Sequence, residues 1–227
     1  YDSTRKKNYD FVNIGFFILK KKYIANISSS KNCKFENNFL NKLIKNKKIS
    51  AYITSHRYYS LSNMRRYFLT SNFFKNRDRF IFLDRDGVIN VKQKKGKYVK
   101  SLKDFTWRKG SLEAINFLRK KNKKIIIISN QAGIALDKVK LEDLNVIHDY
   151  IIKKSLKLGA NIEDVIFCPH HWEDNCTCRK PKSGMFYLAQ KKFNIDLTNS
   201  LFVGDQKTDM ISARNAEIPY LHLNKKK

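Results

Sequence analysis

The stretch Phe80-Ile81-Phe82-Leu83-Asp84-Arg85-Asp86-Gly87 decides the fold of the larger part of this chain. Four consecutive apolar residues, then two carboxylates and a glycine, predict a short buried strand that ends in a polar turn. In an open parallel sheet ligands bind where the strands end, so Asp84 and Asp86 are candidates for chemistry. One carboxylate can attack phosphorus, and a second can transfer protons. The alternative is an ordinary solvated Asp-x-Asp-Gly turn, and only the rest of the chain can decide between the two.

Strand and helix patterns alternate from Phe80 to the end of the chain. Four consecutive isoleucines at 125–128 predict a central strand that is buried on both faces. The alternation predicts an α/β fold, with a doubly wound, Rossmann-like parallel sheet covered by helices on both faces. The expected strands are 80–83, 124–129, 164–168, 201–203 and 220–223, and the expected helices are 111–121, 141 to about 159, 183–193 and 208–216.

The ends of three of these strands carry polar residues at the same relative place. They are Asp84 and Asp86, then Ser129, Asn130 and Gln131, then Asp205 and Asp209. Right-handed crossovers bring all three groups to one edge of the sheet. Phosphoryl transfer needs such a set, because carboxylates hold a divalent cation and polar donors hold the equatorial oxygens. The sequence therefore predicts a phosphoryl-transfer site.

A cluster of cysteines and histidines follows the third expected strand. Cys168, Cys176 and Cys178 lie within eleven residues, together with His170 and His171. Three thiols and one imidazole can close a tetrahedral zinc site, with His170 at the better spacing and His171 as the alternative. Protein ligands would fill all four positions, so we expect a structural zinc that braces the loop. Free cysteines with surface histidines are the alternative.

The motifs from Phe80 to Leu223 resemble those of the haloacid dehalogenase superfamily of phosphatases. Asp84-x-Asp86-Gly87 is similar to the first motif, Ser129 to the second, Lys180 to the third, and Gly204-Asp205-x-x-x-Asp209 to the fourth. Each motif alone is weak, but four in the right order favour membership. The resemblance implies a phosphatase domain at 79–227.

Two groups within the superfamily share the zinc loop that runs into Cys178-Arg179-Lys180-Pro181. They are the heptose 1,7-bisphosphate 7-phosphatases and the histidinol-phosphate phosphatases. Ser129-Asn-Gln-Ala-Gly-Ile-Ala135 and Lys180-Pro-Lys-Ser-Gly-Met185 are more similar to the heptose enzymes. The resemblance therefore favours removal of the 7-phosphate in the synthesis of nucleotide-activated heptose for lipopolysaccharide or another surface glycan. A catalytically inactive sugar-phosphate binding remnant is a further alternative.

The resemblance implies a role for each polar residue. We infer that Asp84 is the nucleophile and that Asp86 protonates the leaving oxygen and then activates water, which predicts a raised pKa for Asp86 in the substrate complex. Magnesium is expected on the Asp84 carboxylate, the Asp86 carbonyl and Asp205, supported by Asp209, while Ser129 and Lys180 hold the transferring oxygens. The expected substrate contacts are Asn130, Gln131, Gln206 and Arg179, with Arg179 on the distal phosphate. Gln206 stands where heptose enzymes often have lysine.

Residues 1–78 carry no catalytic constellation of their own. The run 10–19 resembles the Val-Asn-x-Gly strand of sugar-phosphate nucleotidyltransferases, and 11–19 and 49–55 are expected strands, with a helix at 39–45. Ser60 stands in place of that family's metal-binding aspartate, and its nucleotide loop is absent from this sequence. We therefore expect an incomplete, inactive nucleotidyltransferase-like α/β segment. The chain begins with Tyr1 instead of Met, which suggests a fragment. From the resemblance, a fused or missing nucleotidyltransferase portion is an expected partner.

The chain is strongly basic, with 47 Lys and Arg against 20 Asp and Glu among its 227 residues. The lysines are spread over the whole length without an arginine-rich stripe, so we expect no nucleic-acid partner. The positive field instead favours anionic small molecules such as sugar phosphates. No apolar run is long enough to cross a membrane, and the cysteine spacing is not a secreted disulfide framework, which predicts a cytoplasmic location.

Overall fold

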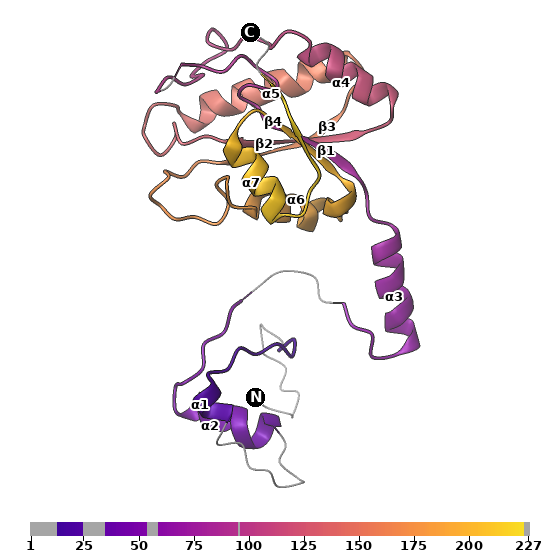
Figure 1. Ribbon diagram of the computed structural model, residues 1–227, viewed down its shortest axis with the longest axis vertical. Coiled ribbons are helices and arrows are strands. Elements are labelled where there is room, and N and C mark those ends of the chain that lie inside the picture. Colours follow the sequence, from indigo (N-terminus) through magenta and orange to yellow (C-terminus); the bar gives the residue numbers. More distant parts are fainter. Residues whose placement is uncertain (1–12, 25–34, 54–58, 95, 225–227) are drawn as a thin grey trace. The chain divides into compact units, whose positions relative to one another are not determined.

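The computed structural model describes residues 13–24, 35–53, 59–94 and 96–224 (Figure 1). The chain forms two compact units, Tyr1–Tyr59 and Ser60–Lys227. Helix α3 (Met64–Lys75) falls in the second unit, whereas the expected phosphatase domain 79–227 begins just after it.

The regular secondary structure in the described part of the first unit consists of short helices. It contains α1 (Lys21–Ile24), a π-helix (Phe35–Leu40) and α2 (Asn41–Lys45), so the predicted helix at 39–45 is confirmed. The predicted strands are wrong where they can be compared, because 13–19 and 49–53 form no strand. A strand needs a neighbouring strand to bond its backbone, and none occurs among the described residues of this unit. The remaining residues of both predicted strands lie outside the described ranges.

The second unit is built on a five-stranded parallel sheet, as predicted. Its strands are β1 (Phe80–Leu83), β2 (Lys124–Asn130), β3 (Ile162–Cys168), β4 (Leu201–Gly204) and β5 (Tyr220–His222). The order across the sheet is β3-β2-β1-β4-β5, and every neighbouring pair is parallel. Because the strand order reverses direction at β1, the carboxyl end of β1 lies at a switch point, where α/β sheets bind ligands.

Helices cover both faces of the sheet (Figure 1). Helices α4 (Ser111–Lys120) and α5 (Leu141–Lys157) lie on one face, and α6 (Gly184–Phe193) and α7 (Lys207–Asn215) lie on the other. The doubly wound fold is therefore confirmed. None of the helices in the described ranges has the length and apolar character that a membrane crossing requires.

Helix α3 was not predicted from the sequence. Its N-terminus is capped by Asn63, whose side chain accepts a hydrogen bond from the backbone N–H of Arg66 at 2.9 Å. Asn194, which follows α6, binds the C-terminal end of α3: its side-chain amide donates hydrogen bonds to the carbonyls of Phe73 and Asn76. An asparagine cap before a helical run is the signal that could have located this helix.

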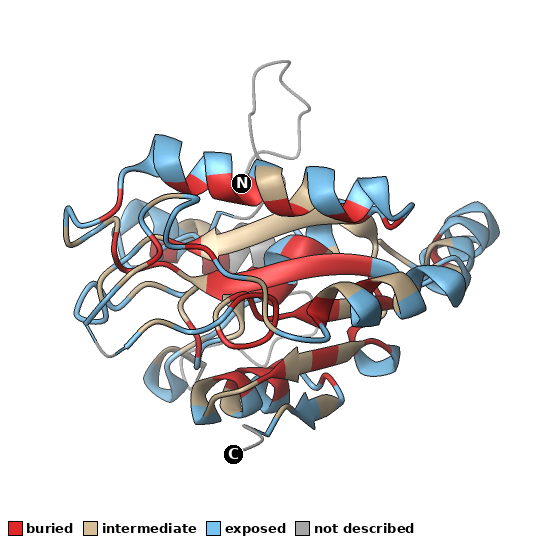
Figure 2. Cartoon of the chain, turned by 90° about the horizontal axis from the view of Figure 1, so that it is seen from above, coloured by how far each residue is buried: buried red, intermediate tan, exposed pale blue. Residues whose placement is uncertain are grey.

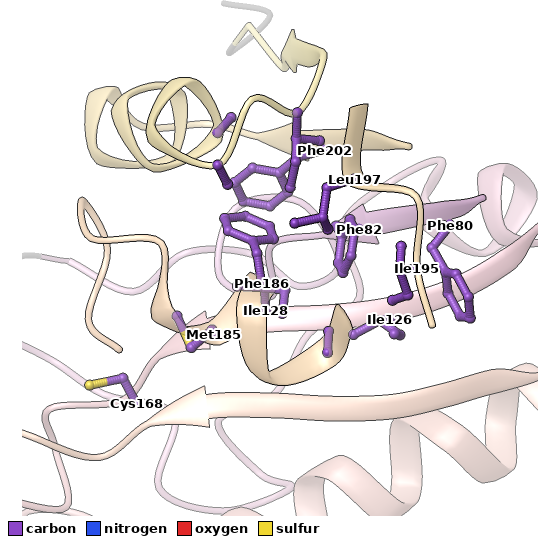
Figure 3. Close-up of a cluster of buried hydrophobic side chains, with 14 residues drawn as sticks. Phe80, Phe82, Ile126, Ile128, Cys168, Met185, Phe186, Ile195, Leu197 and Phe202 are labelled. Atoms are coloured by element: carbon purple, nitrogen blue, oxygen red, sulfur yellow. The ribbon is translucent and has the colours of Figure 1, made fainter. Parts of the chain in front are cut away.

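The core consists of two apolar layers, one on each face of the sheet. Isoleucines 125–128 are fully buried, with Ile126 and Ile128 in one layer and Ile125 and Ile127 in the other. Figure 2 shows the central strand in the colour of buried residues. One layer is centred on Phe82, Phe186 and Phe202, whose rings meet edge to face (Figure 3). Aromatic rings prefer this geometry. The two layers fix the strand ends, and these carry the polar groups described next.

Candidate active site

Asp84 lies immediately after β1 and is held from two directions. Its backbone N–H donates to the carbonyl of Val203 on β4 at 2.9 Å, and its side-chain Oδ1 lies 2.7 Å from Nζ of Lys180. The same ammonium group lies 2.7 Å from Oδ1 of Asp209 and donates to the carbonyl of Ile128 at 3.2 Å. Asp84, Asp209 and Lys180 are all almost completely buried. One cation therefore bridges two carboxylates from different strand ends.

The electrostatics of this bridge follow from its burial. Burial raises the pKa of Asp84 to about 7, with help from the nearby Asp209 and Asp86, although Lys180 acts in the opposite direction. Burial alone would lower the pKa of Lys180, but Asp84 and Asp209 outweigh it and raise that pKa. Lys180 therefore stays charged, and its charge is what permits two carboxylates to lie side by side in the protein interior.

Asp86 is surrounded by hydrogen-bond donors. Arg85 donates to both carboxylate oxygens at 2.9 and 2.8 Å, Asn90 donates to Oδ1 at 2.9 Å, and Gln131 donates to Oδ2 at 2.8 Å. Burial opposes the charge on Asp86, but Arg85 and these donors outweigh burial and lower its pKa. In the free site Asp86 is therefore ionised. The raised pKa that the sequence analysis predicts for Asp86 concerns a different state, the complex with substrate.

The second strand end supplies residues that position their neighbours. Gln131 donates to Ser129 Oγ at 2.7 Å as well as to Asp86, and this orders the hydroxyl beside the carboxylate. The side chain of Asn130 exchanges two hydrogen bonds with the backbone of Lys180, both at 3.0 Å. Asn130 therefore fixes the approach of Lys180 to Asp84, and its predicted contact with substrate stays a prediction.

Asp205 and Asp209 follow β4, and their surroundings fit a divalent cation. Oxygens of Asp84, Asp205 and Asp209 all lie within 4.8 Å of one another. The carboxylate oxygen Oδ1 of Asp205 is buried and has no hydrogen-bond partner, so it is free to coordinate. Oδ2 of Asp209 accepts from the backbone N–H groups of Asp205 and Gln206, which favours a supporting role for Asp209.

Gly87 makes room for Asp205. Its φ is +107°, and a Cβ at this position would lie 2.4 Å from Oδ2 of Asp205. Only glycine permits both the backbone conformation and this close approach. The Asp-x-Asp-Gly turn is therefore shaped so that a carboxylate from another strand end can lie against its backbone.

The predicted metal loop brings three thiols and one imidazole together. The Sγ atom of Cys168 lies 3.6 Å from that of Cys176 and 3.4 Å from that of Cys178, and Nδ1 of His170 lies 3.2 Å from Sγ of Cys178. Ligands of a tetrahedral zinc with the usual bond lengths are separated by roughly 3.5–3.8 Å. The donor set and its spacing fit zinc. Cys168 lies at the end of β3, beside the aromatic layer (Figure 3).

His171 lies apart from this cluster. Its ring stacks on Trp172, and its Nδ1 accepts a hydrogen bond from the backbone of Glu173 at 3.3 Å. The structure therefore places His170 with the thiols. Arg179 is half-buried just beyond the loop and donates to the carbonyl of His170 at 3.3 Å, and Gln206 is half-buried at the start of α7.

Three residues near the site were missed by sequence reasoning. Arg85 and Asn90 bind the Asp86 carboxylate, and His148 on α5 lies 3.5 Å from the Arg85 guanidinium. Burial, together with Arg85, lowers the pKa of His148 to about 3, so it stays neutral beside the cation. Arg85 lies within the Asp-x-Asp-Gly turn and Asn90 follows it by three residues, whereas only the packing of α5 reveals His148.

Comparison with known families shows to which family the sheet and its strand ends belong. A family model described as polynucleotide kinase 3 phosphatase matches residues 79–220, which include the whole sheet. The chain belongs to this phosphatase family. The match begins at the predicted start of the phosphatase domain and does not include residues 1–78, so the nucleotidyltransferase resemblance stays a prediction.

Two relatives of this chain have names that state their substrate. The chain is 39% identical over 143 residues to the D-glycero-alpha-D-manno-heptose-1,7-bisphosphate 7-phosphatase of Campylobacter jejuni, a match that covers 63% of this chain and 80% of the relative. It is 37% identical over 144 residues to the D-glycero-beta-D-manno-heptose-1,7-bisphosphate 7-phosphatase of Helicobacter pylori, covering 63% and 82%. These relatives bear the name that the sequence favoured over the histidinol-phosphate enzymes.

Two solved phosphatase structures are also similar to this chain. The D,D-heptose 1,7-bisphosphate phosphatase of B. bronchiseptica, solved with magnesium and phosphate, matches with a TM-score of 0.59 and 32% identity, covering 63% of this chain and 78% of that chain. A candidate HAD-like phosphatase from Mesorhizobium loti matches with a TM-score of 0.57 and 27% identity, covering 63% and 70%. The parallel α/β fold of the haloacid dehalogenase type is thus confirmed.

Proposed function

We propose that this chain is a magnesium-dependent phosphatase that removes the 7-phosphate of D-glycero-D-manno-heptose 1,7-bisphosphate. The observation that carries the proposal is the bridge of Asp84, Lys180 and Asp209 beside the unpartnered carboxylate oxygen of Asp205. Relatives at 33–39% identity that are named for the alpha or the beta form of this heptose bisphosphate support the substrate class. The magnesium in the B. bronchiseptica structure supports the choice of cation.

The first step is an in-line attack by a carboxylate oxygen of Asp84 on the phosphorus. The bond between phosphorus and the sugar oxygen breaks, and an aspartyl phosphate forms. Magnesium, held by Asp84, the Asp86 carbonyl and Asp205, would neutralise charge on the phosphoryl oxygens. Lys180 and Ser129 hold the transferring oxygens, while Gln131, Gln206 and Arg179 contact the substrate.

Asp86 moves the protons in both steps. A phosphate dianion that arrives beside Asp86 disfavours its ionised form, which raises the carboxyl pKa above its value in the free site. Asp86 then gives its proton to the leaving sugar oxygen. In the second step it takes a proton from water, whose oxygen attacks the aspartyl phosphate and releases inorganic phosphate. Arg85, Asn90 and Gln131 hold the carboxylate ready for that second role.

A substrate panel with a free-phosphate readout tests the proposal. Heptose 1,7-bisphosphate, histidinol phosphate and a 3′-phosphorylated oligonucleotide are compared by kcat/KM with and without magnesium. We expect the heptose bisphosphate to have a kcat/KM at least about tenfold above the others, with no turnover after chelation. A higher value for histidinol phosphate would overturn the substrate assignment, and a higher value for the oligonucleotide would favour the activity in the family model's description.

We also infer that Cys168, His170, Cys176 and Cys178 bind a structural zinc. The loop contains little apolar surface, so the metal would supply much of its rigidity. Metal analysis of the purified protein should give about one zinc per chain, and Cys176→Ser should lower both zinc content and the unfolding temperature, by roughly 2–4 °C per kcal/mol lost. His171→Ala, outside the cluster, is the matched control. Equal zinc content in both variants would contradict the assignment.

For residues 1–78 we infer an inactive segment of nucleotidyltransferase origin. The inference rests on the sequence resemblance of 10–19 and on Ser60 in place of the metal-binding aspartate. In the described structure Ser60 Oγ accepts a hydrogen bond from Arg66, and Asn13 Oδ1 accepts one from the backbone N–H of Gly15. Both side chains are therefore hydrogen-bonded to residues close by in the sequence.

A further inference from the structure

Arg85 is a buried cation between the Asp-x-Asp-Gly turn and helix α5. Only 1% of its surface is exposed, although its guanidinium group carries a permanent charge. Nη2 donates to both carboxylate oxygens of Asp86, at 2.9 and 2.8 Å. Nε is buried and has no hydrogen-bond partner among the described residues. The remaining nitrogen, Nη1, therefore decides whether the guanidinium group is fixed at more than one point.

His148 on α5 binds that remaining nitrogen. Its Nε2 lies 3.5 Å from Nη1 of Arg85. A guanidinium group can only donate, so Nε2 must accept and the ring must carry its proton on Nδ1. Burial and Arg85 lower the pKa of His148 to about 3, so the ring is neutral and Nε2 is free to accept. The ring is buried, and its centre lies 5.3 Å from that of Phe167 on β3, so packing fixes its position.

Resting on the proposed function, we propose that His148 is a positioning residue that holds Asp86 for proton transfer through Arg85. The imidazole fixes one terminal nitrogen of the guanidinium group, and the other terminal nitrogen binds both oxygens of Asp86. Asn90 and Gln131 each bind a single oxygen of that carboxylate. Proton transfer is efficient only when the donor and the acceptor are held in the right direction. Without the acceptor on His148 the guanidinium group can turn, and the Asp86 carboxylate can turn with it.

Two variants of His148 with nearly the same size separate its role as acceptor from its packing. Glutamine can place an amide oxygen near the position of Nε2, whereas the methionine thioether is only a weak acceptor. His148→Met should lower kcat for heptose 1,7-bisphosphate about tenfold or more, with KM within about twofold, because proton transfer loses its alignment. His148→Gln should keep kcat within about threefold of the natural value. Rapid acid quench should show that His148→Met slows both the formation and the breakdown of the aspartyl phosphate, since Asp86 acts in both steps.

A double-mutant cycle tests whether His148 acts through Arg85. In the background of Arg85→Met, the change His148→Met should lower kcat by less than about twofold, because the group that transmits its effect is gone. A further loss of about tenfold in that background would overturn the inference. If Arg85→Met does not fold, the comparison of His148→Gln with His148→Met decides alone.

Ser155→Ala is the matched control for the His148 variants. It removes a buried polar atom from the same helix, about two turns further along. It should leave kcat and KM unchanged. Equal kcat values for His148→Gln and His148→Met, or a change confined to KM, would overturn the positioning role while the proposed function stands. Failure of the natural protein to release phosphate from heptose 1,7-bisphosphate would instead contradict the proposed function itself.

Discussion

Asp84→Asn should reduce phosphate release from heptose 1,7-bisphosphate by about 10⁴-fold or more, because an amide cannot serve as the attacking carboxylate. The change keeps the size and shape of the side chain in a fully buried position, so the protein should stay folded. Acid quench of the natural enzyme during turnover should trap phosphate on the protein, and the same quench of Asp84→Asn should trap none. Steady-state kinetics and protein-bound phosphate are the two measurements.

Asp78→Asn is the matched control for this substitution. Asp78 precedes β1 at the end opposite Asp84, and its half-exposed carboxylate pairs with Lys124 at 2.7 Å. An exposed ion pair contributes little to stability, so this variant should keep its activity and its unfolding temperature. If Asp84→Asn retained more than about a hundredth of the natural kcat, the nucleophile would have to be a different group.

Lys180→Met should both inactivate and destabilise the protein. Methionine fills a similar volume but leaves Asp84 and Asp209 facing each other without the shared cation. Removal of one partner from a buried ion pair costs about 3–5 kcal/mol. The unfolding temperature should fall by roughly 6–20 °C at neutral pH. Urea or thermal unfolding gives this loss, and phosphate release gives the activity.

The pH dependence of this loss identifies its cause. Burial raises the pKa of Asp84, and Lys180 is the group that lowers it, so without Lys180 the folded-state pKa of Asp84 lies still further above its value in the unfolded chain. Burial of this carboxyl group therefore costs least when it is protonated. The deficit in the free energy of unfolding should therefore be small near pH 4 and grow as the pH rises. Lys154→Met, an exposed lysine on α5, should show no deficit at any pH. A deficit that is independent of pH would indicate lost packing in place of unpaired charge.

The sequence was sufficient for most of the fold of the second unit. Continuous apolar runs such as 125–128 predict strands that are buried on both faces, and helical spacing between them predicts the doubly wound sheet. Helix α3 and the first unit were harder to predict from the sequence. An Asn63 cap is a local signal that was overlooked, whereas the predicted strands at 11–19 and 49–55 depended on partners that the described part of the unit does not contain.

For the site, the sequence by itself determined which residue types follow each strand, and hence the order Asp84, Ser129, Lys180, Asp205. Spacing along the chain cannot tell which of these side chains touch. Tertiary structure decided that Lys180 bridges Asp84 and Asp209, that Asn130 holds the backbone of Lys180, and that donors from three places surround Asp86. These contacts join residues up to 96 positions apart, and only the packing of the strand ends fixes them. The residue types of the Asp-x-Asp-Gly turn predict phosphoryl transfer. The neighbours that the fold places around Asp84 and Asp86 set the pKa values of these two carboxyl groups.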